Sequence, residues 1–94
     1  MAEVFLSPEI ALLQYDRLRE DPRRHKVLDR VDEILDALEE NPGQAWLRAH
    51  RFQDPPLWCV MLDASGEAWV ILWSVDDDDD DRVLVEYIGS ASFA

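Results

Sequence analysis

Cysteine, glycine and long apolar runs are the scarcest features of this 94-residue chain. The single cysteine, Cys59, excludes an intrachain disulfide and fits a reducing compartment, so we expect a cytoplasmic protein with a buried free thiol. Three glycines cannot supply a glycine-rich phosphate loop. No apolar run approaches the roughly 20 residues of a membrane-spanning helix, and the first residues lack the basic and apolar regions of a secretory signal. We therefore expect no membrane partner.

Basic residues are also few, and the resulting charge is strongly negative. Nine Lys and Arg residues stand against 21 Asp and Glu residues, which gives a formal net charge of −12. This balance argues against a general nucleic-acid-binding protein, which needs cations to displace phosphate counterions, and it disfavours an anionic membrane surface. Residues 1–53 hold 11 acidic and 8 basic residues, whereas residues 54–94 hold 10 acidic residues and one basic residue. The negative charge is therefore concentrated in the second half.

Six consecutive aspartates, Asp76 to Asp81, supply half of the net charge. A calcium ion takes about six to eight oxygen ligands, but this run lacks the glycine and the closing glutamate of an EF-hand loop. Like charges repel and extend a chain, so we predict a solvated, flexible hairpin loop and no metal. The chain has no Cys/His metal spacing and no Ser/His/Asp pattern elsewhere, and we predict no cofactor.

The rest of the composition is that of a small globular protein, with 48% hydrophobic and 32% charged residues. Its length fits one domain over residues 1–94. The apolar segment at residues 4–6 predicts a short first strand. Ser7-Pro8 and Asp21-Pro22 each have the form of an N-cap followed by proline in the first helical turn. We therefore predict a helical hairpin, with helices over residues 8–20 and 22–40, that ends at Asn41-Pro42-Gly43.

The two predicted helices differ in their apolar patterns. The second helix repeats aliphatic residues at helical spacing: Val27, Val31, Ile34 and Leu38. In the first helix one face carries Ala11, Tyr15 and Leu18. Ile10 and Leu13 lie on other faces, so this helix is apolar over more than one stripe. We expect that surface either to be covered by the sheet or to meet a partner.

Four strands are predicted after Gly43, over residues 45–52, 57–62, 68–75 and 82–88. Residues 63–66 predict a hairpin turn, across which we expect Trp58 to face Trp69. Residues 68–75 are apolar on both faces, which predicts the centre of the sheet. The fold class is therefore α+β: a short N-terminal strand, a helical hairpin, then an antiparallel meander of three to four strands, with the helices packed on one sheet face.

In this order the segments resemble the RelE/ParE toxin superfamily of bacterial toxin–antitoxin systems. Residues 4–9, Val-Phe-Leu-Ser-Pro-Glu, are similar to that family's opening strand and helix start. Leu35 to Pro42 are similar to the end of its second helix. Its closing strands are similar to residues 58–60, 69–73 and 85–89. The resemblance spans nearly the whole chain and implies a single RelE/ParE-like domain over residues 1–94.

The sequence departs from this family where its ribonuclease members carry cations. Those members place Arg and Lys on the sheet face, often with a terminal Tyr, to stabilise the charge that develops as messenger RNA is cut. Cys59, Val70 and Ser90 stand where the resemblance leads us to expect arginine, and Phe93 stands in place of the terminal tyrosine. The resemblance therefore implies a degenerate ribonuclease site.

The candidate catalytic residues are the basic residues near this surface: Arg48, His50, Arg51 and Arg82. One interpretation is a phosphate-binding cluster with His50 as acid or base. The other, which we favour, is a solvated strand that pairs with nearby acids. Strand alternation predicts Arg48 and His50 on one face and Arg51 on the other. A ribonuclease site therefore requires these side chains to converge with Arg82 in one cleft.

We expect a toxin-like protein of a type II toxin–antitoxin system that acts by protein–protein binding. The resemblance implies an antitoxin or a cellular target such as gyrase as the partner, and Ile10, Leu13 and Trp46 are the candidate contact residues. Two alternatives stay open: an active ribosome-dependent mRNA endoribonuclease, whose partner is the ribosome or messenger RNA, and an unrelated small acidic interaction domain. A homodimer also stays open.

Overall fold

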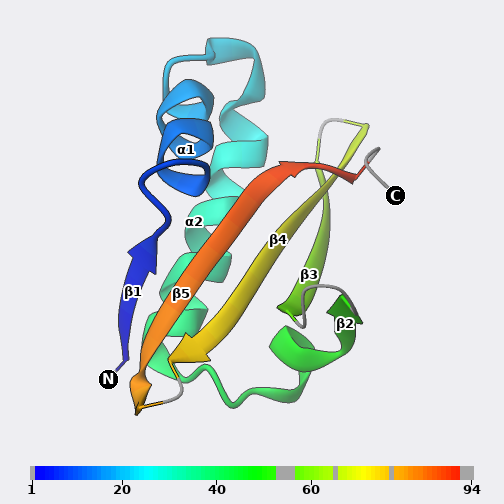
Figure 1. Ribbon diagram of the computed structural model, residues 1–94. Helices are drawn as coiled ribbons and strands as arrows, with labels where there is room; N and C mark the ends of the chain where they lie inside the picture. The colour runs from blue at the N-terminus through cyan, green and yellow to red at the C-terminus, as the bar shows by residue number, and fades with distance from the viewer. Residues whose placement is uncertain (1, 53–56, 65, 77, 92–94) are drawn as a thin grey trace.

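The computed structural model describes residues 2–52, 57–64, 66–76 and 78–91. Its elements, with η for a 3-10 helix, are β1 (Glu3–Leu6), α1 (Ala11–Arg19), η1 (Pro22–Arg24), α2 (His25–Glu40), η2 (Ala45–Arg48), β2 (His50–Phe52), β3 (Leu57–Ala64), β4 (Glu67–Asp76) and β5 (Asp79–Ser90). The strands form one five-stranded sheet, and α1 and α2 both lie on one face of it (Figure 1). The predicted α+β class and the packing of the helices on one sheet face are confirmed.

The sheet has the order β1-β5-β4-β3-β2, so β4 lies at its centre, as its two apolar faces predicted. Strands β2 to β5 pair antiparallel, whereas β1 pairs parallel with β5. On the helix side of β4, Ile71 and Trp73 are fully buried. Val70 and Leu72 point to the opposite side and are still only 3% and 6% exposed. Both faces of the central strand therefore exclude water.

Helix α2 contacts the sheet through one buried apolar stripe. Its four aliphatic residues at helical spacing are completely buried, as their periodicity predicted: Val27, Val31, Ile34 and Leu38. They form one core with sheet residues such as Ile71, Trp73 and Val85. Full burial of each such side chain contributes about 1.5–3 kcal/mol, so this stripe fixes the helical hairpin on the sheet.

The first helix begins three residues later than predicted, and Ser7 is not its N-cap. Residues 8–10 form a turn and α1 begins at Ala11, with no side-chain capping bond at Ile10. The Ser7 backbone N–H donates to the Val85 carbonyl at 2.9 Å and continues the pairing of β1 with β5, and the turn at residues 8–10 separates this pairing from the helix. The other predicted cap is confirmed, because the Asp21 carboxylate accepts the Arg23 backbone N–H at 3.0 Å, although it opens η1 rather than α2 itself.

The strand predicted over residues 45–52 is wrong in its first half. Residues 45–48 form η2, and β2 is limited to His50–Phe52. The Leu47 side chain is fully buried, and its carbonyl accepts the Trp73 indole Nε1–H at 3.1 Å. Anchoring Leu47 in the core in this way is incompatible with an extended strand at that point.

The predicted pairing of Trp58 with Trp69 is also wrong. Trp58 pairs with Trp73, with ring centroids 6.4 Å apart, and Trp69 pairs with Leu62. The register follows from the turn: Ala64 pairs with Glu67, and Gly66 has a φ of 76°, which favours glycine. The turn is therefore two residues long rather than four, and each strand extends further than predicted.

The acidic run lies at a hairpin, as predicted, and the two strands of this hairpin extend into the run. Strand β4 continues to Asp76, which pairs with Asp79 at the start of β5. The Asp78 backbone N–H donates to the Asp76 carboxylate at 2.9 Å, and that of Asp81 donates to Asp79 at 3.0 Å. Several of the aspartates thus stabilise the hairpin backbone. Among the described residues, no group of three His, Cys, Asp or Glu side chains is placed to hold a metal ion. No helix in the described part of the chain is long and apolar enough to cross a membrane.

Replacing Trp73 by Phe removes the indole N–H and leaves the buried Leu47 carbonyl without its donor. We expect Trp73→Phe to lower the free energy of unfolding by about 2–4 kcal/mol, because a lost hydrogen bond is combined with lost core volume. Urea denaturation measures this. Trp46→Phe is the matched control, since Trp46 is 46% exposed, and it should change stability by less than about 0.5 kcal/mol. Equal effects at the two positions would contradict the assigned anchor.

Tyr15 gives the helical hairpin a pH dependence. Its hydroxyl donates to Asp32 Oδ1 at 2.6 Å, and this bond, followed by burial, raises the pKa of Tyr15 to about 12. Because the folded pKa lies above the ordinary value of about 10, the stabilisation is complete below pH 10 and is lost as the pH rises towards 12. We expect the stability of the wild type to fall over this range relative to Tyr15→Phe in urea titrations. A constant difference would show that the bond does not form.

Candidate functional site

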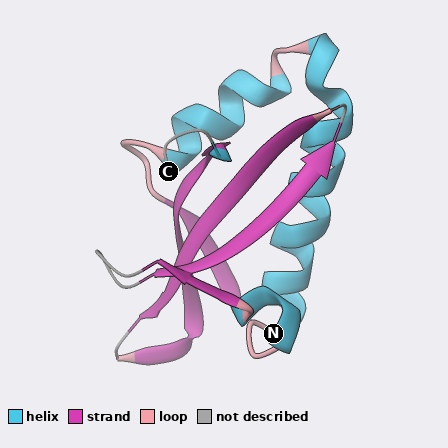
Figure 2. Ribbon diagram, turned by 90° about the vertical axis from the view of Figure 1, so that its right-hand side faces the viewer, coloured by secondary structure: helices cyan, strands magenta, loops and turns pink. Residues whose placement is uncertain are grey.

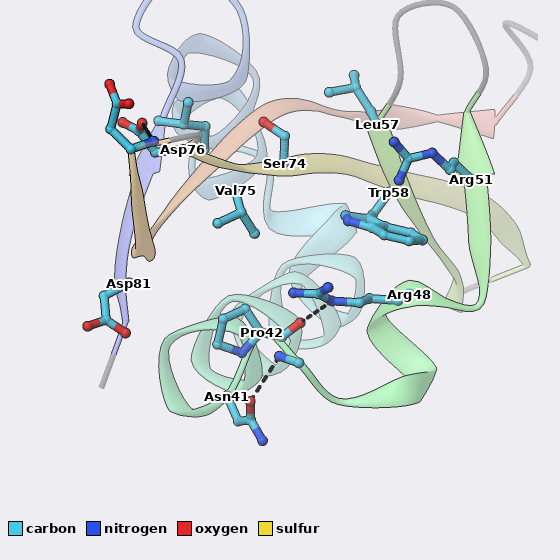
Figure 3. Close-up of a pocket in the computed structure, with 13 residues that line it drawn as sticks. Asn41, Pro42, Arg48, Arg51, Leu57, Trp58, Ser74, Val75, Asp76 and Asp81 are labelled. Atoms are coloured by element: carbon cyan, nitrogen blue, oxygen red, sulfur yellow. Dashed lines mark hydrogen bonds between the residues drawn. The ribbon is translucent and has the colours of Figure 1, made fainter.

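A cleft opens at one end of the sheet because its strands end at different points. Strand β3 pairs with β4 only as far as Trp58 and Trp73, whereas β4 continues to Asp76. The β4–β5 hairpin therefore projects beyond β3, and the segment from the end of α2 to η2 lies across from it. Between them is a cleft of about 920 Å³ (Figure 3). Ligand-binding pockets typically measure about 300–1,000 Å³, so the cleft has the size of a binding site.

Three parts of the chain line the cleft. The end of α2 and η2 contribute Asn41, Pro42, Gly43 and Arg48. Strands β2 and β3 contribute Arg51, Leu57 and Trp58. The β4–β5 hairpin contributes Ser74, Val75, Asp76, Asp78, Asp81 and Leu84. The cations and the indole thus come from one side and the carboxylates from the other.

The cationic wall is built on the Trp58 ring. The guanidinium carbon of Arg51 lies 4.4 Å from the centroid of this ring, and that of Arg48 lies 5.4 Å from it. Arg48 is also 5.5 Å from the Trp73 ring, and its Nε–H donates to the Pro42 carbonyl at 2.9 Å. Arg48 is therefore fixed between the core and the α2–η2 segment, whereas Arg51 is held by its contact with Trp58 and is exposed.

The carboxylate wall comes from the acidic hairpin. Asp76 lies 3.7 Å from Arg82, a distance at which the two charges partly neutralise each other. Within the described part of the chain, no cation lies within 4.0 Å of the Asp78 or Asp81 carboxylate, and no carboxylate lies that close to Arg51. The cleft thus separates an uncompensated positive charge from uncompensated negative charges.

The four basic residues singled out from the sequence do not converge. Arg48 and Arg51 line the cleft together, although strand alternation predicted them on opposite faces; the 3-10 turn at η2 removes Arg48 from the strand. His50 pairs with Cys59 in the sheet register and does not line the cleft. Arg82 also lies outside the lining, with its guanidinium 5.3 Å from the Phe5 ring.

The three candidate partner-binding residues are exposed, but they do not share one surface. Ile10 and Leu13 are 49% and 50% exposed at the start of α1, whereas Trp46 lies on η2. Helix α1 and the green turn of η2 lie at different ends of the molecule in Figure 1. The structure adds Leu12, which is 39% exposed and was not singled out from the sequence. The neighbouring residue Ala11 is buried against the core. Successive residues of a helix lie about 100° apart around its axis, so Leu12 lies nearer the solvent.

The sheet face opposite the helices is apolar and carries Cys59. Figure 2 shows both helices on the other side of the strands. Phe5 and Met61 on this face are exposed, and Leu72 beneath them is buried. Cys59 is half-buried rather than fully buried as predicted, and this burial raises the pKa of its thiol, which makes it a weak nucleophile.

No protein-family model, curated protein or solved structure matches the chain. The cleft and the surface of α1 are therefore the features of the molecule that bear on its function.

The two arginines of the cleft should differ in their contribution to folding. Arg48→Ala loses a charged hydrogen bond to Pro42 and the contact with two indoles, so we expect a loss of about 1–2 kcal/mol in the free energy of unfolding. Arg51→Ala loses one exposed stacking contact and should cost less than about 1 kcal/mol. Urea denaturation of both variants measures the difference. A larger loss at Arg51 would reverse the assignment of Arg48 as the structural residue.

Proposed function

We propose that the protein is a toxin-like protein of a bacterial type II toxin–antitoxin system that acts by binding another protein. The observation that carries this proposal is the outward surface at the start of α1, where Ile10, Leu12 and Leu13 are all exposed and Ile10 and Leu13 are three residues apart. Contiguous apolar side chains on a small protein mark an interaction site, because exposing them to water is costly.

The architecture supports the toxin-like part of the proposal. The resemblance rests on the order of strand, helix, helix and meander, and it requires the helical hairpin to pack on the sheet of the meander. Helix α2 does pack there through its buried stripe. An unrelated domain that matched only by coincidence of element order would not need this packing.

The open sheet face supports binding rather than RNA cleavage. Cys59 and Val70, which stand where the resemblance leads us to expect arginine, lie on this face, and neither carries a charge to hold a phosphate or stabilise a developing negative charge. The aspartates of the cleft add a repulsive field, since two unit charges 4 Å apart interact by about 4 kcal/mol at an effective dielectric of 20. An RNA backbone would therefore meet little attraction here.

An active ribosome-dependent mRNA endoribonuclease is the second candidate function. The presence of Arg48 and Arg51 in one cleft favours it. The same cleft lacks His50 and Arg82 in its lining and contains three aspartates. Two cations without a proton-transfer group form an incomplete site for cutting a phosphodiester bond.

Induced expression in a bacterial host tests the proposal. We expect growth arrest by the wild type and relief of the arrest by Leu13→Glu, because a charge at the centre of an apolar contact costs about 2 kcal/mol or more in binding. Lys26→Glu is the matched control, an exposed residue of α2 changed to the same side chain. It should arrest growth like the wild type.

Translating ribosomes incubated with the purified protein distinguish the two candidate functions. We expect messenger RNA to stay intact. Position-specific cleavage that is lost in an Arg48→Gln, Arg51→Gln double variant would establish the ribonuclease instead. If the protein has no effect on growth and messenger RNA stays intact, both candidate functions are excluded. That result would favour an unrelated interaction domain.

A further inference from the structure

We propose that the cleft beside Trp58 binds an extended peptide segment that carries an acidic side chain at one end and a basic side chain at the other. The site is separate from the α1 surface, so this inference goes beyond the proposed function. It rests on the charges, the backbone and the aromatic ring that the cleft brings together (Figure 3).

Charges of opposite sign face each other across the cleft without a partner among the described residues. Arg51 contacts the Trp58 ring but no carboxylate of the described residues, and it presents the donors of its guanidinium to the cleft. Across the cleft, Asp78 and Asp81 have no cationic partner in the described part of the chain. A guanidinium binds a carboxylate through two parallel hydrogen bonds, and aspartates attract an ammonium or a guanidinium. The cleft is thus complementary to a dipolar ligand.

The backbone of β4 lies between these charges. Ser74, Val75 and Asp76 pair with β5 on one side. On the other side the pairing of β3 with β4 ends at Trp58 and Trp73, one residue short of the start of β3 at Leu57, and no described residue pairs with Ser74, Val75 or Asp76 there. Strand residues direct their N–H and C=O groups alternately to the two sides. An extended peptide can therefore hydrogen-bond to this edge, as in other cases of strand addition.

The charges of the cleft and of the whole chain disfavour other ligands. A nucleic acid presents only negative charge and would approach the aspartates as well as Arg51, so the acidic wall selects against it. A second copy of the chain carries the same net charge of −12 and is repelled. A peptide with both signs of charge meets neither penalty.

Titration with synthetic peptides tests this inference, with Trp fluorescence or calorimetry as the readout. The probe is acetyl-Glu-Val-Thr-Val-Lys-amide, and the comparison peptide has glutamine at both ends. We expect the dipolar peptide to bind about fivefold or more tightly than the neutral one, and the preference to shrink at high salt. The amide NMR signals of Ser74 and Val75 and the indole signal of Trp58 should shift on binding.

Charge variants locate the binding site. Arg51→Gln and Asp81→Asn should each remove most of the preference for the dipolar peptide, whereas Arg51→Glu should make a peptide with lysine at both ends the better ligand. Arg19→Gln on α1 is the matched control and should bind like the wild type. Because Arg51 and Asp81 are exposed, these variants should unfold at the wild-type temperature. Leu13→Glu should keep full peptide affinity, which separates this result from the test of the α1 surface.

Three outcomes would overturn the inference. The dipolar and neutral peptides could bind equally, the NMR shifts could fall outside the cleft, or no binding could occur at millimolar peptide. A single-stranded oligoribonucleotide that binds the wild type but not Arg51→Gln would assign the cleft to phosphate instead.

Discussion

The burial of Trp73 is the constraint on which the sheet, the helical hairpin and the cleft all depend. This residue is completely buried in the central strand, and its indole N–H holds the carbonyl of Leu47. That bond fixes η2, and η2 in turn places Arg48 against the rings of Trp58 and Trp73. The cationic wall of the cleft is therefore a consequence of core packing.

Sequence reasoning predicted those elements whose pattern is imposed by burial over many residues. Helix α2 is an example, because every buried position from Val27 to Leu38 follows one helical stripe. Strand β4 is another, because Val70 to Trp73 are apolar on both faces and occupy the middle of the sheet. In both cases the local preference and the tertiary environment require the same side chains. The apolar pattern alone is therefore sufficient to predict the element.

The errors occurred where a single long-range contact overrides the local pattern. Ser7 has the sequence of a helix cap, but its N–H donates to Val85 of the neighbouring strand β5, which is distant along the chain, and the helix begins only at Ala11. Residues 45–48 have the composition of a strand, but Trp73 fixes Leu47 in a turn. The same turn brings Arg48 and Arg51 to one ring, which the alternation of a regular strand forbids. The basic residues of the candidate site could therefore be predicted from the sequence, but not the fact that Arg48 and Arg51 meet at the Trp58 ring.

The parallel pairing of β1 with β5 determines the order in which the molecule can assemble. Strand β5 lies between β1 and β4 in the sheet. The first strand, β1, is therefore connected to the strands β2 to β4 only when residues 79–90 pair with both β1 and β4. Contacts this distant along the chain form late and slowly, and until then the apolar strands β3 and β4 are open to other chains. The aspartates at the junction of β4 and β5 flank these strands as charged gatekeepers. The residues that line one wall of the cleft therefore also occupy the position, next to apolar strands, where charged residues in natural proteins disfavour aggregation.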